Sequence, residues 1–299
     1  MTNGTHLGEL AALGTALLWS FSALAWTSAG HRVGTLPVCF IRLVITIGYL
    51  LAYGRLVRGL WVPSDASHET WVLLSWSGFV GFFLADLCLL KALLLIGPRL
   101  TLLFQSLSPP FAALISGLFL HEPLAAKDWL AMAVTLSGVT WVVLERANGT
   151  PTRPGRKAAA GMLLAILGAM GQAGGLVLSR RGIGQYDAAA ATFIRVLPAM
   201  AGFLLLLTLV RAWPSVLAAT RDRTAMFILS LGAFVGPFLG VILSMVAVRH
   251  CHAGVAATIL CTMPVLILPL VIVVYGERVS LRAAAGAAIS VAGVALLML

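Results

Sequence analysis

One carboxylate lies well inside a long hydrophobic run, where an ionised side chain is costly to bury. Asp86 falls past the middle of the run Trp71–Leu95, and Lys91 follows it nearer the end of the run. Ionisable residues at bilayer depth are rare and often mark the path of a substrate or an ion. Because burial favours the neutral form of a carboxylate, Asp86 is a candidate proton-coupling residue. The alternative is a structural pair with a cation or a broken helix end.

Polar and aromatic residues in other hydrophobic runs could complete a binding site around Asp86. Cavities for small amphipathic molecules are mostly apolar and carry a few polar groups, although each aromatic ring could instead face lipid. On this basis we predict a substrate cavity lined by Trp19, Ser22, Phe79, Phe82, Phe83, Asp86, Gln105, Ser108, Gln172, Phe234, Phe238, Thr258 and Thr262.

Glycines and prolines interrupt several of the same hydrophobic runs at matching depths. Proline removes a helical hydrogen bond and kinks a helix, and paired breaks in a membrane protein are a pointer to a site near the midplane. The alternative is that Pro and Gly are simply tolerated in membrane helices. We favour hinges for the matched set, which comprises Gly78, Gly81, Pro109, Pro110, Gly236, Pro237, Gly240 and Pro264.

Other charged or nucleophilic residues favour structural roles. Arg42 and Arg195 recur in two Phe-Ile-Arg segments, which suggests a scaffold that anchors loop carbonyls or lipid phosphates rather than a direct substrate contact. Glu122 and Glu277 also recur, and each is placed to cap a following helix. The triplet at 250–252 contains two histidines but no nearby carboxylate, so we expect a loop, no metal site and no cofactor.

The elements that must position these residues are membrane helices. Of the 299 residues, 60% are hydrophobic and only 10% charged, whereas soluble domains carry about 25% charged residues. The net charge of +10 resides on single or paired residues at the ends of hydrophobic runs, a pattern typical of membrane-interface anchors. We therefore expect a lipid bilayer as partner and no nucleic acid.

We predict ten membrane helices from hydrophobic runs of about 20 residues. They are Leu7–Ala29, Pro37–Val57, Trp71–Leu95, Gly97–Leu120, Trp129–Leu144, Ala159–Leu178, Ala189–Val210, Ala225–Val248, Ala253–Val274 and Leu281–Met298.

The second half of the chain repeats the first at an offset of about 155 residues. Pro109 and Pro264 show this offset, as do Gly138 and Gly293. We predict a first repeat over residues 1–147, a polar linker over 148–157 and a second repeat over 158–299. Because five crossings change sides of the membrane, two five-helix repeats would have inverted topology, which favours a transporter.

The distribution of basic residues predicts how these helices are oriented in the membrane. Six Lys or Arg residues lie near the N-terminal face, and a larger number lie near the opposite face. The positive-inside rule therefore favours termini outside the cytoplasm.

The motifs and their spacing resemble the drug/metabolite transporter superfamily, specifically ten-helix carriers with two EamA domains. The matching segments are Ala16-Leu-Leu-Trp-Ser-Phe-Ser22, the two Phe-Ile-Arg segments, Glu122 with Gly138, and Gly276-Glu277 with Gly293. His121 departs from the Gly that many relatives carry before the Glu. The resemblance implies an exporter of amino acids or similar small metabolites. We expect it to function as a monomer in the inner membrane of a bacterium.

The favoured function is thus a secondary carrier that works by alternating access, with a drug-like or nucleotide-related metabolite as the alternative cargo. An intramembrane enzyme would need a cluster of catalytic residues within the hydrocarbon, and only Asp86 lies well inside, so we expect no enzyme. A channel would need repeated polar groups along one pore. The position that corresponds to Asp86 in the second half is Val241, which fits a gated carrier better.

Overall fold

The computed structural model describes residues 6–121, 124–145, 156–263, 265–266 and 281–298. These residues form only helices and their connections, which confirms the all-α class. The predicted hinge Pro264 and the predicted caps Glu122 and Glu277 lie outside the described residues.

The described residues of the first half form six α-helices and two π-helical segments. In chain order they are α1 (Leu7–Val33), α2 (Thr35–Tyr53), η1 (Gly54–Arg58), α3 (His68–Gly78), η2 (Phe79–Leu84), α4 (Ala85–Gln105), α5 (Ser108–Phe119) and α6 (Ala126–Glu145).

The described part of the second half follows the same plan with one extra helix. Its elements are α7 (Arg156–Ile183), α8 (Ala188–Leu209), α9 (Trp213–Arg221), α10 (Arg223–Ala233), η3 (Phe234–Gly240), α11 (Val241–His250), α12 (Ala253–Leu260) and α14 (Leu281–Met298). Helix α9 lies in the segment that we expected to be a simple connection, and Pro214 in its first turn is compatible with a helix start.

Six helical stretches in the described chain are long and apolar enough to cross a membrane. They are Leu7–Val33, Thr35–Arg58, His68–Ala92, Ala158–Ile183, Ala188–Leu209 and Arg223–His250, and two shorter apolar helices cover Ser108–Phe119 and Ala284–Leu296. The chain is therefore a multi-pass helical membrane protein.

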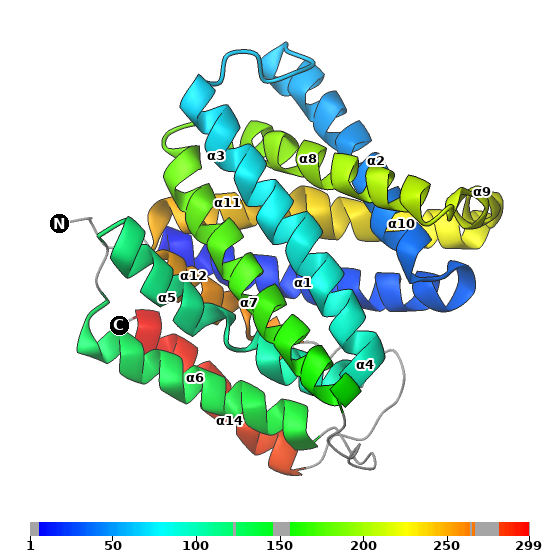
Figure 1. Cartoon of the computed structure of the whole chain (residues 1–299). Helices are drawn as coiled ribbons and strands as arrows, with labels where there is room; N and C mark the ends of the chain where they lie inside the picture. Colours follow the sequence, from blue (N-terminus) through cyan, green and yellow to red (C-terminus); the bar gives the residue numbers. More distant parts are fainter. Residues whose placement is uncertain (1–5, 122–123, 146–155, 264, 267–280, 299) are drawn as a thin grey trace.

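Helices from one half pack mainly against helices from the other half. Helix α4 packs along α7, α1 packs against α10 and α11, and α3 packs against α7 and α8. Helices α6 and α14 lie side by side along the lower edge of Figure 1. The two halves are thus interleaved rather than separate bodies.

Reciprocal glycine contacts join α6 and α14. A Cβ atom added at Gly138 would lie 2.4 Å from the Ser290 nitrogen, and one added at Gly293 would lie 2.4 Å from the Thr135 nitrogen. Small residues that allow such backbone approach are how membrane helices pack tightly without a hydrophobic driving force.

The predicted helix breaks lie at the π-helical segments or in the first turn of a helix. Gly81 and Gly236, with Pro237, fall inside the π-helical segments η2 and η3, and Gly78 directly precedes η2. Pro109 and Pro110 occupy the first turn of α5, where proline is tolerated, so the chain turns at residues 106–107 rather than kinking within one helix. Helix α4 also runs through residues 96–97, where we expected one helix to end and the next to begin.

Candidate substrate cavity

A cavity of about 670 Å³ lies between the two halves of the chain. The first half contributes residues of α1, α2, η2, α4, α5 and α6, and the second half contributes residues of α7, α8, η3, α11 and α12. This volume is within the range of pockets that hold a small molecule.

Six of the predicted cavity residues line this space. They are Trp19, Phe82, Asp86, Gln105, Ser108 and Gln172. Gln105 donates a hydrogen bond from Nε2 to Oε1 of Gln172 at 3.0 Å, which joins α4 of the first half to α7 of the second. The hinge residues Gly81 and Pro237 also reach the cavity wall.

The predicted hydroxyl residues outside the lining bond to helix backbone. The Ser22 hydroxyl donates to the Gly232 carbonyl at 3.0 Å. Thr258 donates to the Gly254 carbonyl at 2.8 Å, and Thr262 donates to the Ile259 carbonyl at 2.6 Å. Hydroxyls bonded in this way are satisfied within the bundle.

The predicted aromatic residues outside the lining pack against other rings. Phe79 and Phe83 stack with centroids 5.5 Å apart, and Phe83 meets Phe203 edge-on at 5.3 Å. Phe234 and Phe238 stack at 5.4 Å, and both contact Tyr49. These predicted cavity rings therefore pack on neighbouring aromatic residues rather than line the cavity.

The π-helical segments allow close approach of backbone at the cavity wall. A Cβ atom added at Gly175 on α7 would lie 2.7 Å from the Gly81 Cα atom of η2. In the second half, a Cβ atom at Gly236 would lie 2.2 Å from Ser22 Oγ, and one at Gly240 would lie 2.7 Å from the Trp19 ring. Single π-helical turns inside α-helices often occur at functional sites.

The first-half arginine of the cavity has a carboxylate partner. Arg42 Nη2 lies 2.6 Å from Asp86 Oδ2, and the guanidinium also stands over the Trp26 ring, 4.4 Å from its centroid. The side chains are only 13% and 21% exposed. The Arg42–Asp86 pair thus joins α2 to α4 inside the protein.

The second-half arginine stacks in the same manner. Arg195 is 4% exposed and lines the cavity. Its guanidinium lies 4.3 Å from the centroid of the Phe82 ring, and its Nη1 lies 3.6 Å from the sulfur of Met245.

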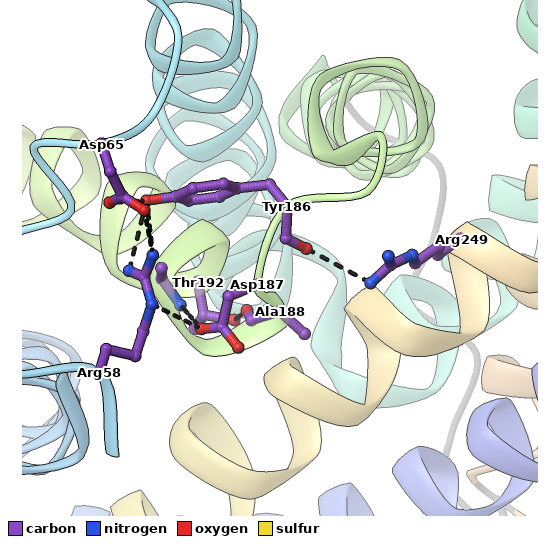
Figure 2. Close-up of polar contacts among 8 residues, drawn as sticks. Arg58, Asp65, Tyr186, Asp187, Ala188, Thr192 and Arg249 are labelled. Carbon is purple, nitrogen blue, oxygen red and sulfur yellow. Dashed lines mark hydrogen bonds and ion pairs between the residues drawn. The ribbon is translucent and has the colours of Figure 1, made fainter. Parts of the chain in front are cut away.

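Polar contacts close the end of the bundle where α2, α7 and α11 end, which we call the closed face. Arg58 Nη2 lies 2.5 Å from Asp65 Oδ2, and the Tyr186 hydroxyl donates to Asp65 Oδ1 at 2.7 Å. Arg58 also donates to the Tyr186 hydroxyl at 3.3 Å and lies 3.9 Å from Asp187 Oδ1. Arg249 donates to the Tyr186 carbonyl at 3.4 Å. Figure 2 shows these side chains converging from both halves, and we call them the latch.

The latch perturbs two groups that lie outside the membrane-spanning helices. The hydrogen bond from Tyr186 holds the pKa of Asp65 below its usual range. Desolvation and the bond to Asp65 raise the pKa of Tyr186 to about 12. At neutral pH the Asp65 carboxylate is therefore ionised and the Tyr186 phenol is protonated, which are the states that these hydrogen bonds require.

An apolar plug lies between the cavity and the latch. It includes the fully buried side chains of Leu74, Ile194, Met245, Val248 and Ile259, together with Cys251. Met245 contacts Arg195 of the cavity, and Tyr186 of the latch packs against the same cluster.

The cavity reaches the surface at the opposite end, which we call the open face. His31 and Thr35 line the cavity and are exposed. They lie where α1 ends and α2 begins, whereas Arg58 of the latch lies at the far end of the α2–η1 helix. Near the open face, Arg32 pairs with Asp222 at 3.0 Å.

Sequence reasoning assigned Arg42 and Arg195 to scaffold roles, yet both line the cavity. It did not select Trp26 or Tyr186. The available signal for the arginines was their position inside hydrophobic runs, since charged residues there usually face a cavity. No local motif marks Tyr186, because its partners Arg58 and Asp65 lie more than a hundred residues away in the chain.

Comparisons with known proteins identify the fold and the family. No curated protein matches the chain. A solved structure titled "Crystal structure of protein" has a TM-score of 0.74 and 22% sequence identity, and the match covers 97% of this chain and 95% of the other. This likeness shows the fold. The model of the EamA-like transporter family matches residues 6–144 and again 159–299. The chain therefore belongs to the EamA-like transporter family, whose members are membrane transporters of small molecules.

Proposed function

We propose that this protein is a secondary carrier that exports amino acids or similar small metabolites by alternating access. The observation that carries the proposal is a cavity shared by both halves that reaches the surface at the open face and is blocked at the closed face by the plug and the latch. A carrier must hold its substrate between two such barriers and open only one at a time.

The closed face would open by separating contacts between the halves. Arg58 and Asp65 belong to the first half, and Tyr186, Asp187 and Arg249 belong to the second. Breaking these contacts would let α2 and α3 move away from α7, α8 and α11, after which water and substrate would reach the plug.

The π-helical segments are the proposed hinges. Each interrupts one long helix of its half beside the cavity, η2 between α3 and α4 and η3 between α10 and α11. Helix kinks commonly occur at such irregular turns, so a change of bend at η2 and η3 would close the open face as the closed face opens.

An inverted arrangement of the two repeats would support this exchange. The two glycines that join α6 to α14 make equivalent contacts at an offset of 155 residues. Arg42 and Arg195, which recur in the two Phe-Ile-Arg segments, both line the cavity. An inverted pair of repeats could exchange conformations and so present the same cavity to either side.

The distribution of basic residues supports export. If the termini lie outside the cytoplasm, the closed face is external, because Gly8 near the N-terminus packs against Cys251 at that end. The open face would then load substrate from the cytoplasm of a bacterium. Within this proposal the chain works as a monomer, since residues of one copy build the cavity, the plug and the latch.

Counterflow in proteoliposomes tests the proposal. Purified protein is reconstituted with an unlabelled amino acid or metabolite inside, and uptake of the same labelled compound is followed. We expect saturable counterflow that Trp19→Ala and Gln105→Ala alter, since both residues line the cavity. Phe227→Ala is the control, because that ring is 71% exposed. Continuous conductance without counterflow would indicate a channel, and no movement of any compound in a broad screen would contradict the proposal.

A further inference from the structure

Arg195 is a buried cation without a protein counter-ion in the described chain. Arg195 is 4% exposed, and among the described residues no carboxylate lies within 4.0 Å of its guanidinium. Its Nε atom is buried with no hydrogen-bond partner, and the contact of Nη1 with a methionine sulfur is weak. Burying a charge in this state is unfavourable unless something else balances it.

The first half contains the matched case in which the charge is balanced. Arg42 occupies the equivalent position of the first Phe-Ile-Arg segment, stacks on Trp26 as Arg195 stacks on Phe82, and pairs with Asp86 at 2.6 Å. The position that corresponds to Asp86 in the second half is Val241. The second half therefore keeps the arginine but carries an apolar side chain where the first half has the carboxylate.

Val241, which stands in place of the carboxylate, faces the cavity rather than lipid. Val241 lines the cavity together with Arg195 and is 4% exposed. Met245, which contacts the Arg195 guanidinium, lies one helical turn after Val241 on α11. Because residues four apart share a helix face, Val241 points toward the same side as the Arg195 contact.

We propose that Arg195 binds an anionic group of the substrate, and that this group is a carboxylate of a small organic acid. The planar guanidinium matches the two oxygens of a carboxylate in a bidentate fork. The Phe82 ring under the guanidinium fixes its plane, and the apolar residues nearby, Val196, Val241 and Leu260, would contact the rest of the acid. The Arg42–Asp86 pair is internally neutralised and leaves Arg195 as the available cationic site of the described lining.

This inference rests on the proposed carrier function for its biological meaning, but its test uses binding alone. Full-length protein in lipid nanodiscs is titrated with phenylacetate, its neutral isostere phenylacetamide, and phenyl phosphate. Intrinsic fluorescence reports binding, because Trp19 and Trp26 line the cavity. Loss of one charge-assisted hydrogen bond corresponds to roughly a tenfold change in affinity or more. We expect phenylacetate to bind at least about tenfold more tightly than the amide.

Two variant pairs locate the preference at Arg195. Arg195→Gln is expected to remove the preference for the acid, and Arg195→Lys to retain part of it. Val241→Asp supplies the missing carboxylate and is expected to abolish the preference by pairing with Arg195. Val241→Asn adds the same bulk without the charge, so it changes affinity for both probes alike and keeps their ratio. The Val241 pair keeps the test decisive if the arginine variants fail to fold.

The outcomes separate the two proposals. Equal affinity for the acid and the amide in the wild type would overturn the assignment of Arg195, as would an unchanged preference in Arg195→Gln or in Val241→Asp. Tighter binding of phenyl phosphate than of phenylacetate would overturn the choice of a carboxylate. A strong preference for the acid that depends on Arg195, with no counterflow of any compound, would support the binding site and contradict the carrier.

Discussion

The latch predicts how strongly the closed face is held shut. Tyr186→Phe removes one hydroxyl and leaves the ring against the plug. The lost contacts are a hydrogen bond to Asp65 at 2.7 Å and two from Arg58, one from each Nη atom, at 3.3 Å. A hydrogen bond to a charged group contributes about 1.5–3 kcal/mol when it is buried.

The exposure of Asp65 lowers the expected contribution of this hydrogen bond. The Asp65 side chain is 46% exposed, so water replaces part of the lost interaction, and roughly 1 kcal/mol is the appropriate magnitude. A free-energy change of that size shifts a two-state equilibrium about fivefold. Tyr186→Phe should therefore increase, by about that factor, the fraction of molecules in which the latch and the plug have opened.

A native cysteine reports this opening. Cys251 belongs to the plug and is 7% exposed, whereas Cys39 and Cys261 line the cavity. In a chain that keeps only Cys251, a membrane-impermeant maleimide should label the Tyr186→Phe variant about fivefold faster than its parent. Tyr49→Phe is the matched control, because it also removes one tyrosine hydrogen bond, to the Ser230 carbonyl at 3.3 Å, which is not among the latch contacts. Equal labelling of Tyr186→Phe and its parent, or equal acceleration by Tyr49→Phe, would refute the assignment of these contacts as a latch.

Three further predictions follow from named contacts. The pKa of Asp65 is lowered and that of Tyr186 is raised to about 12, so the latch contribution should be complete above the ordinary carboxyl pKa of about 4 and below the ordinary phenol pKa of about 10. It should be lost as the pH falls through the lowered Asp65 value or rises through about 12. The ratio of Cys251 labelling between Tyr186→Phe and its parent should thus stay constant from about pH 5 to 9; a marked slope within that window would contradict the assignment. Gly138→Ala should lower stability by about 1–3 kcal/mol because its Cβ would meet the Ser290 nitrogen, measured by thermal unfolding in detergent, while Gly48→Ala has open space and should not destabilise the protein. Asp86→Asn should lower the free energy of unfolding by about 2 kcal/mol, because it leaves Arg42 unpaired. If the double variant with Arg42→Gln were destabilised by the full sum of the two single effects, the coupling energy of the ion pair would be zero, and this prediction would be wrong.

Periodicity and composition decided the helical membrane class because hydrophobic runs of this length have few alternatives in a bilayer. The duplicated glycines and prolines also indicated where helices would depart from regularity, and Gly81, Gly236 and Pro237 do lie in π-helical turns. These features are local or recur at a fixed offset, so they can be read along one chain.

The direction in which each side chain points was decided by tertiary packing. Phe82 and Phe83 are adjacent, yet Phe82 lines the cavity under Arg195 while Phe83 packs on Phe203. Both residues lie in a π-helical turn, which changes the register of side chains relative to an α-helix.

Asp86 shows the division most clearly. The sequence marked it as a costly charge inside a hydrophobic run and left two roles open. The fold brought Arg42 to 2.6 Å from it and left Arg195, the repeat of Arg42, without a carboxylate among the described residues. Sequence alone determined that Asp86 is buried, because burial follows from the hydrophobic run around it. Only the tertiary structure decided which charges neutralise each other, because that depends on distances between helices far apart in the chain.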